Sequence, residues 1–483
     1  MGSDHEHGGD DRPAKCHRAG DAIKEEGGTA RMKTADQETS GRWRTGTAPG
    51  AYPLFGHALQ LGRRPLEFLA SLPAHGDLVE LRLGTRRAYV PCHPDLVQQV
   101  LLNSRVFDTG GPVKEKARPI LGNGLITSDW SDHRRQRRLV QPAFHSARIA
   151  AYAEMMREEC EAEVRSWQPG RPIDVSEAMQ AMTARVTART LFSTAIAPEA
   201  VTEIQQCLPV VIRGAYRRAV DPTGLLGRLP APANRDFGRA LARLHRLIEQ
   251  ITADYQRTGG NHGDLMSALL GARDAEDDGR LADDEIHDQV MTLLLAGIET
   301  TASALSWTLH LLGRNPAVEE RLHAEVDEVL GHRPPSYADL PRLDYTRRVF
   351  TETLRLYPPA WLYSRTTTAS TELAGLRLPV NTDVIVSPYV LHHDSALFPD
   401  PERFDPDRWL PERAATVPRG AMIPFGAGSR KCIGDVFGLT EATLALATIA
   451  AHWRLRPVPG RSVRPRPQMS LGTGPVLMVA DSR

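Results

Sequence analysis

Residues 425–434 have the sequence Phe-Gly-Ala-Gly-Ser-Arg-Lys-Cys-Ile-Gly, and this segment holds the densest chemistry in the chain. Its three glycines let the backbone adopt positive φ and pass close to a flat ligand. Apolar residues recur at helical spacing from Val436 to Leu446, so a helix is expected to begin just after Cys432. The dipole and the free N–H groups at a helix N-terminus stabilise a thiolate. A cysteine in this position is most often an ordinary buried residue, and the alternative is a thiolate that binds a metal.

The composition limits the class of protein. The five cysteines, Cys16, Cys92, Cys160, Cys207 and Cys432, form no C-x-x-C pair, which argues against a disulfide framework and favours a reducing cytoplasm. The chain has 59 basic and 59 acidic residues, so its charge gives no reason to expect nucleic acid or an acidic membrane as a partner. With 41% hydrophobic residues among 483, it can bury a sizeable core.

The first 47 residues are polar and rich in glycine, and they contain no apolar run of the length that a signal peptide needs. We expect residues 1–47 to be a disordered tail, with a targeting or docking arm as the alternative. Residues 48–483 are expected to form one large domain. From Met291 to Gly313 the only full charge is Glu299, but seven Thr, Ser and His residues interrupt this run, which favours a buried core helix over a membrane anchor.

The local patterns predict a mainly α domain with a small β region. Apolar and polar residues alternate around a turn from Leu78 to Pro91, which indicates a hairpin. Helical periodicity then dominates from Pro94 to about Leu356. Loops are expected at 110–112, 222–232 and 274–279, strands at 373–380 and 383–387, and a last helix at 436–453 before a strand-like tail.

The pattern F-G-x-G-x-R-x-C-x-G in residues 425–434 matches the haem-binding signature of the cytochrome P-450 family at every fixed position. The chain therefore resembles this family. The resemblance implies a triangular, helix-rich domain with a long central helix over haem b. It implies that Cys432 is the thiolate ligand of the iron, that Arg430 pairs with a haem propionate, and that Phe425, Gly426 and Gly434 contact the cofactor.

A second match lies in Ala296-Gly297-Ile298-Glu299-Thr300-Thr301. A glycine inside a helix costs about 1 kcal/mol relative to alanine, so Gly297 needs a reason. The resemblance implies that Ala296 and Gly297 leave room for O2 and substrate above the haem. It makes Glu299 and Thr300 the acid and alcohol that conduct protons to O2, and a hydroxyl suits a relay because it both accepts and donates hydrogen bonds. The alternative for Glu299 is a solvated or salt-bridged carboxylate.

A third match is Glu352-Thr353-Leu354-Arg355, just before a double proline. Alone, a glutamate three residues before an arginine is usually a surface ion pair of small value. In the family it belongs to a structural Glu-Arg-Arg cluster, which the resemblance assigns to Glu352, Arg355 and Arg403.

A basic segment, His133 to Arg138, supplies further candidates. His133 and Arg137 are four residues apart and share a helix face. The resemblance makes them propionate donors, together with Arg365, although many members carry tryptophan at the position of His133; Trp130 has the wrong spacing. The alternatives are a solvated face and a nucleic-acid patch. We expect the outward residues to attract an acidic electron donor: Arg134, Arg135 and Arg138.

The resemblance implies a monooxygenase that inserts one oxygen atom of O2 into a C–H bond of a hydrophobic molecule. Residues 214–218, 229–235 and 407–413 are similar to bacterial oxygenases of cyclic sesquiterpene hydrocarbons, which favours a terpene. A fatty acid or polyketide would fit the same apolar wall. That wall is expected to comprise Leu294, Leu295, Ala296, Ala360, Trp361 and Leu362.

The chain contains no Gly-rich dinucleotide fingerprint and no iron–sulfur cysteine cluster. Electrons from NAD(P)H are therefore expected to arrive through a ferredoxin reductase and a ferredoxin, and the protein is expected to be a cytoplasmic monomer. A haem-thiolate sensor without turnover is the alternative from another class, but it has no need of Glu299 and Thr300. A peroxide-driven hydroxylase usually replaces that pair with a group that binds a substrate carboxylate.

Overall fold

The computed structural model describes residues 42–483 except 194–195, 220, 222–226, 228, 259–261 and 275–278. The chain divides into Met1–Arg42 and Trp43–Arg483, and the fold below belongs to the second unit. Residues 1–41 of the expected tail, and most of the expected loops at 222–232 and 274–279, lie outside the described residues. Strand β1, Thr45–Thr47, pairs with β2, so regular structure begins before the expected boundary at residue 48.

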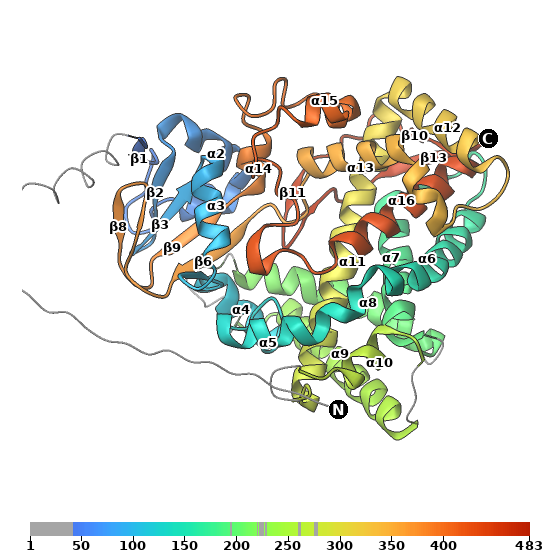
Figure 1. The fold of residues 1–483 in the computed structure, drawn as a ribbon, viewed down its shortest axis with the longest axis horizontal. Helices are drawn as coiled ribbons and strands as arrows, with labels where there is room; N and C mark the ends of the chain where they lie inside the picture. The colour runs from blue at the N-terminus through green and yellow to red at the C-terminus, as the bar shows by residue number, and fades with distance from the viewer. Residues whose placement is uncertain are drawn as a thin grey trace, which may run out of the picture. The chain divides into compact units, whose positions relative to one another are not determined.

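A six-stranded sheet forms one side of the domain (Figure 1). The expected hairpin supplies its second and third strands and is closed by Gly84 at φ +64°. The next two strands come from the C-terminal half of the chain, which brings residues 363–367 beside residues 107–108. In sheet order the strands are β1, β2 (Leu78–Leu83), β3 (Arg86–Pro91), β9 (Asp383–Val386), β6 (Tyr363–Thr367) and β4 (Phe107–Asp108).

Smaller sheets complete the β region. The expected strands near residues 373–380 form one hairpin, and the C-terminal tail forms the other pairs. The prediction of strands in the tail is confirmed because alternate residues of β13 are buried. The strands are β5 (Pro172–Asp174), β7 (Thr371–Leu373), β8 (Leu376–Leu378), β10 (Trp453–Pro457), β11 (Arg466–Pro467), β12 (Leu471–Gly472) and β13 (Leu477–Ser482).

Helices make up the rest of the described domain, as the periodicity predicted. The expected loop at 110–112 is wrong in part, because a helix begins at Gly111 with a proline in its first turn, where its missing N–H costs no hydrogen bond. The helices are α1 (Ala58–Arg63), α2 (Pro65–Ser71), α3 (Pro94–Leu102), α4 (Gly111–Leu121), α5 (Trp130–Val140), α6 (Ser146–Ser166), α7 (Val175–Phe192), α8 (Pro198–Ala219), α9 (Pro232–Thr258), α10 (Leu265–Gly271), α11 (Asp283–Arg314), α12 (Pro316–Leu330), α13 (Asp344–Leu356), α14 (Pro388–His392), α15 (Pro411–Ala414) and α16 (Asp435–His452).

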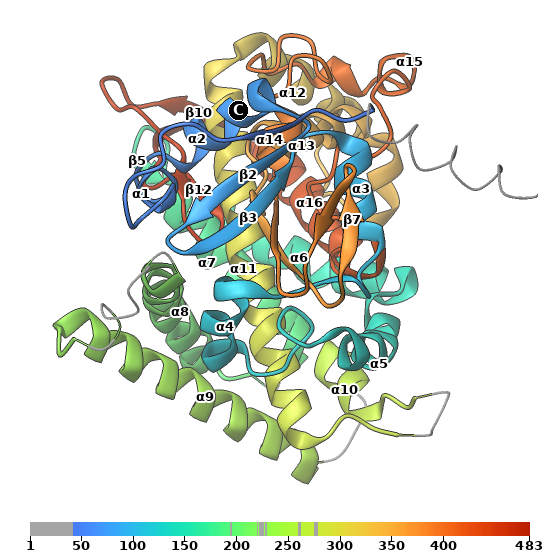
Figure 2. The ribbon, with the colours of Figure 1, turned by 90° about the vertical axis from the view of Figure 1, so that its left-hand side faces the viewer.

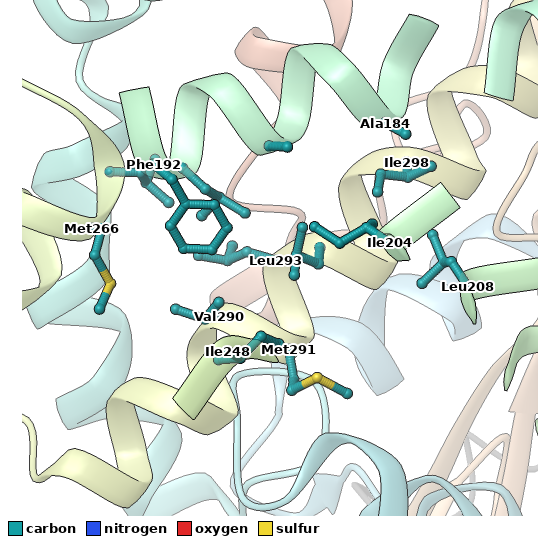
Figure 3. Close-up of a cluster of buried hydrophobic side chains, with 14 of the residues drawn as sticks. Ala184, Phe192, Ile204, Leu208, Ile248, Met266, Val290, Met291, Leu293 and Ile298 are labelled. Atoms are coloured by element: carbon teal, nitrogen blue, oxygen red, sulfur yellow. The ribbon is translucent and has the colours of Figure 1, made fainter. Parts of the chain in front are cut away.

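Helix α11 runs through the middle of the domain and packs on α7, α9, α13 and α16 (Figures 1 and 2). Among the described helices only α11 is long and apolar enough to cross a membrane, and 67% of its most apolar window is buried inside the protein. The prediction of a buried core helix is therefore confirmed. Figure 3 shows the apolar cluster around its first half, where Val290 and Leu293 lie between Phe192 of α7 and Ile248 of α9, and Ile298 lies beside Ala184 of α7.

Helix α16 follows the cysteine segment directly. Its small and aliphatic residues are buried against α6, α12 and α13, and this packing holds the helix start in place. Because burial on several sides fixes the helix, the residues that precede Asp435 are held with it. The fold thus positions Cys432 from the C-terminal side, while the turns of residues 425–431 position it from the N-terminal side.

Candidate functional site

The cysteine segment closes into a tight loop. The backbone N–H of Cys432 donates to the carbonyl of Phe425 at 2.9 Å. Gly426 and Gly428 both have φ +70°, a conformation that residues with a side chain rarely adopt. A Cβ on Gly428 would lie 2.3 Å from the carbonyl oxygen of Leu101, so only glycine fits there. The prediction is confirmed for Gly426 and Gly428, whereas Gly434 has φ −97° and does not need to be glycine for its backbone conformation.

The Cys432 thiol lies at the start of α16 and retains an exposed surface. Burial by the surrounding protein raises its pKa, whereas a hydrogen bond from the Gly434 backbone lowers it. The charges of Arg137 and Lys431 lower the pKa further, and Asp435 raises it. An accessible sulfur that receives a backbone hydrogen bond at a helix N-terminus can act as a thiolate ligand once a metal cation replaces its proton.

Four basic side chains converge beside this loop. His133 is buried in α5, and burial lowers its pKa to about 3, with further lowering by Arg430, Arg137 and Arg365. The pKa of Arg365 on β6 falls to about 10, first because of burial and then because of Arg430. Because the charges of these residues shift one another's pKa values, the predicted donors from α5, β6 and the cysteine loop lie near one another.

The protein satisfies only part of this donor set. Arg430 donates to Asp108 Oδ1 at 2.5 Å and to the Ser128 carbonyl at 2.9 Å, but its Nε and Nη1 atoms are buried without a partner. The buried Nδ1 of His133 also lacks one. A haem carries carboxylates on one edge and an iron at its centre. Orphaned, buried N–H groups next to a cysteine loop fit that combination, since buried donors require acceptors.

Glu299 and Thr300 lie on α11, and each has a hydrogen-bond partner. Thr300 Oγ1 donates to the carbonyl of Ala296 at 2.6 Å. Glu299 Oε1 accepts a hydrogen bond from Ser470 Oγ at 2.8 Å. Burial raises the pKa of Glu299, and the hydrogen bonds from Ser470 lower it. Glu299 and Thr300 are thus adjacent in the chain, and each side chain hydrogen-bonds to another residue. The Glu299 carboxyl is neither freely solvated nor part of a salt bridge.

The structure gives Gly297 a different reason from the predicted one. A Cβ on Gly297 would lie 3.2 Å from Oγ1 and 3.3 Å from Cγ2 of Thr187 on α7. The absent side chain therefore allows α7 and α11 to approach closely. This packing role stands beside the expectation that Gly297 makes room for O2 and substrate, which stays a prediction.

The Glu352 cluster is confirmed for two of its three members. Arg355 binds both carboxylate oxygens of Glu352, at 2.9 and 2.8 Å, and both side chains are fully buried. The third member is Arg408, whose Nε lies 3.3 Å from Glu352, and Trp409 also donates to this carboxylate. Arg403 supplies only its backbone carbonyl to Arg355, with its side chain exposed. The prediction of Arg403 is therefore wrong.

The residues of the expected substrate wall differ in their exposure. Leu294 is 1% exposed and belongs to the core that Figure 3 shows in part. Trp361 belongs to the apolar cluster on the sheet, and Leu362 packs against that cluster. The Nε1 atom of Trp361 donates to the Gln468 carbonyl. Leu294 and Trp361 thus lie in the apolar core, and their place in a substrate wall stays a prediction. The half-buried members of the expected wall are Leu295, Ala296, Ala360 and Leu362.

The three outward arginines of α5 are less available than predicted. Arg135 pairs with Glu285 at 2.8 Å, and Arg138 pairs with Asp274 at 2.9 Å. Arg134 is exposed and lies 5.0 Å above the ring of Trp130. Of the predicted docking charges for an electron donor, Arg135 and Arg138 are therefore already used within the chain.

The sequence reasoning missed three residues of the site: Asp108, Arg408 and Ser470. The sequence does contain a signal for Arg408. The pattern proline-acid-arginine-aromatic occurs at 401–404 and again at 406–409, and the prediction of Arg403 rests on the first copy. Asp108 and Ser470 lie in short segments without a motif, and only their contacts in three dimensions reveal them.

An accessible cysteine at a helix N-terminus, next to converging propionate donors, defines a haem-thiolate protein. The family model for cytochrome P450 matches residues 47–479, and the chain belongs to this family. It is therefore a monooxygenase that uses haem and O2 and receives electrons from redox partners. The solved structure of the cytochrome P450DA heme domain is similar with a TM-score of 0.83 and 28% identity, covering 91% of this chain and 98% of that one.

Curated relatives include bacterial terpene oxygenases. Cyclooctatin synthase of Streptomyces melanosporofaciens is 68% identical, over 94% of this chain and 99% of that protein. Cyclooctat-9-en-7-ol 5-monooxygenase of the same species is 55% identical, over 91% and 96% of the two chains. Pentalenene oxygenase of Streptomyces avermitilis is 49% identical, over 87% and 93%.

Proposed function

We propose that this chain hydroxylates a cyclic terpenoid with the cyclooctat-9-ene skeleton. The observation that carries this proposal is the 68% identity to cyclooctatin synthase over nearly the full length of both proteins. The second relative is named for adding oxygen to a substrate that is already an alcohol. A terpenoid bearing one hydroxyl group is therefore the first substrate to test, and pentalenene, a hydrocarbon by the third relative's name, is the comparison.

The half-buried candidates of the wall support a hydrophobic substrate. Leu295, Ala296 and Ala360 carry no polar side-chain atom, so they favour an apolar skeleton over a charged molecule. In this reaction one C–H bond becomes C–OH, the second oxygen atom leaves as water, and two electrons and two protons are consumed. We propose NAD(P)H as the electron source, with a ferredoxin reductase and a ferredoxin as carriers, and a monomer acting in the cytoplasm.

The proximal residues hold the cofactor in this proposal. Cys432 would ligate the iron, and the propionates would accept hydrogen bonds from His133, Arg137, Arg365 and Arg430. The bound haem supplies the oxygen-activating chemistry. Arg430 and His133 would thereby satisfy the buried nitrogen atoms that lack partners within the chain.

The distal residues handle protons. Burial raises the pKa of Glu299, so its carboxyl holds a proton more readily than an exposed glutamate. Thr300, the next residue on α11, carries a hydroxyl that can pass a proton on after leaving the Ala296 carbonyl. An acid with a raised pKa beside an alcohol, on a helix that is largely buried, is an arrangement suited to proton delivery.

The proposal is tested by binding and turnover with purified, haem-loaded protein. Cyclooctat-9-en-7-ol, pentalenene and palmitate are added in turn while the absorption spectrum is followed for a shift of the iron from low to high spin. We expect the largest shift with cyclooctat-9-en-7-ol, and a product heavier by one oxygen atom once redox partners and NAD(P)H are added. Preference for palmitate, or no shift with either terpenoid, would overturn the substrate proposal.

A further inference from the structure

We propose that Ser470 is a positioning residue for Glu299, held in place by the turn between β11 and β12. This inference rests on the proposed role of Glu299 in proton delivery. It adds a residue from the C-terminal tail to the distal site. The chain distance is large, since the two residues are 171 positions apart.

The contact is short and enclosed. Ser470 Oγ donates to Glu299 Oε1 at 2.8 Å, and the Ser470 side chain belongs to a residue that is only 3% exposed. Water therefore has little access to replace this hydrogen bond. The Ser470 hydroxyl therefore restrains the orientation of the Glu299 carboxyl.

The turn that carries Ser470 is fixed by other bonds. The carbonyl of Leu471 accepts from Ser303 Oγ at 2.7 Å and from Trp307 Nε1 at 2.9 Å. Ser303 and Trp307 follow Glu299 at intervals of four residues, so all three lie along one stripe of α11. The N–H of Leu471 donates to the Pro359 carbonyl at 3.0 Å. Ser470 is therefore presented to Glu299 by a turn that does not depend on Ser470.

Ser470 is the polar group that acts on the Glu299 carboxyl. Burial raises the pKa of Glu299, and the side-chain and backbone hydrogen bonds from Ser470 lower it. Within the described part of the chain, no charged side chain contributes to this shift. When the carboxyl gives up its proton, the negative charge is stabilised by the hydrogen bond that Ser470 already donates to Oε1. Ser470 thus orients the acid and eases the release of its proton.

The test compares two hydroxyls at the contact between this turn and α11, that of Ser470 on the turn and that of Ser303 on the helix. Ser470→Ala removes the side-chain hydrogen bond to Glu299, whereas Ser303→Ala removes a bond to the Leu471 carbonyl and leaves the Ser470 hydroxyl in place. Ser470→Thr keeps a hydroxyl. In each haem-loaded variant, the protonated carboxyl of Glu299 is titrated by its infrared C=O band, which is assigned by its loss in Glu299→Gln. The coupling of NAD(P)H use to product and its solvent isotope effect are measured alongside.

We expect Ser470→Ala to raise the pKa of Glu299 by about one unit, a tenfold change in acidity, and to lower coupling. Ser470→Thr and Ser303→Ala should stay near the parent protein. Equal pKa values in Ser470→Ala and Ser303→Ala would overturn the inference. If Glu299→Gln itself keeps full coupling, the proposed proton-delivery role fails, and this outcome is distinct from a failure of Ser470 alone.

Discussion

The two sides of the site are built in different ways. On the proximal side, ten consecutive residues and the helix that follows them fix Cys432 through the backbone, with glycines at positive φ. On the distal side, Glu299 is held by a side chain from the far end of the chain, on a turn that is anchored to α11. A site made by contiguous backbone is visible in the sequence. A site made by side chains from distant segments becomes visible only in the fold.

The difference also predicts how each side fails. A change on the proximal side removes the ligand or support of the cofactor, so activity is lost as a whole. A change on the distal side leaves the cofactor bound and alters only how protons arrive. Three substitutions separate these behaviours, and a fourth tests a helix contact outside the site.

The largest effect is expected for Cys432→Ser on the proximal side. A hydroxyl is a much weaker ligand than a thiolate, so we expect loss of the haem-thiolate absorption band with carbon monoxide and loss of product formation. Cys207→Ala is the control, because Cys207 is buried in the helical core away from the cysteine loop. A Cys432→Ser variant that kept the absorption band and the product formation would contradict the role of Cys432 on the proximal side.

The next effect tests the support of the proximal side. Arg408→Ala should lower the free energy of unfolding by about 3 kcal/mol, because it removes a buried partner of Glu352. Arg403→Ala should change it by less than about 0.5 kcal/mol, since that side chain is exposed. Urea unfolding of the two variants measures both values. A larger loss of unfolding free energy in Arg403→Ala than in Arg408→Ala would show that Arg403 is the third member of the Glu352 cluster.

A smaller effect is expected on the distal side. Thr300→Ala should keep the haem-thiolate spectrum but reduce the coupling of NAD(P)H use to product by about tenfold, because a hydroxyl of the proton path is lost. Thr300→Ser should recover most of the coupling. Thr301→Ala is the matched control, since Thr301 is the adjacent hydroxyl and faces α16 near Gly438. Equal coupling in Thr300→Ala and Thr301→Ala would contradict the assigned role.

The smallest effect concerns the contact of α9 with α11. His245 Nδ1 lies 3.2 Å from His287 Nε2, and the rings stack. Burial and then His287 lower the pKa of His245, while Glu249 and Asp288 raise it. The folded protein thus binds fewer protons here than the unfolded chain, so this contact loses stability as pH falls below about 6.5 and is unaffected above it.

Hydrogen exchange along α9 measures this loss. We expect amide exchange in residues 240–248 to speed up severalfold between neutral and mildly acidic pH. His245→Gln should remove most of this pH dependence, whereas His75→Gln, at an exposed position, should not. If the parent protein shows no such change in the amide exchange of residues 240–248 between neutral and mildly acidic pH, the histidine pair does not hold the two helices together.

The comparison also explains what the sequence could predict. The hairpin at 78–91, the buried helix α11 and the cysteine loop follow from local periodicity and glycine chemistry, and all three are confirmed. The Glu352–Arg355 pair was also found, because both residues lie on one turn of α13. Arg408 was missed in favour of a nearby copy of its pattern. Asp108, Ser470 and the contact of Gly297 with Thr187 depend on tertiary packing, which no local pattern encodes.

The central claim is that this chain activates O2 and transfers one of its atoms to a terpenoid. The direct measurement is turnover under isotopically heavy O2 in ordinary water, with redox partners, NAD(P)H and the terpenoid that produces the spin shift. The account predicts one heavy oxygen atom in each product molecule and none when the label is in the water instead. A product that takes its oxygen from water, or that forms only when peroxide is added, would contradict it.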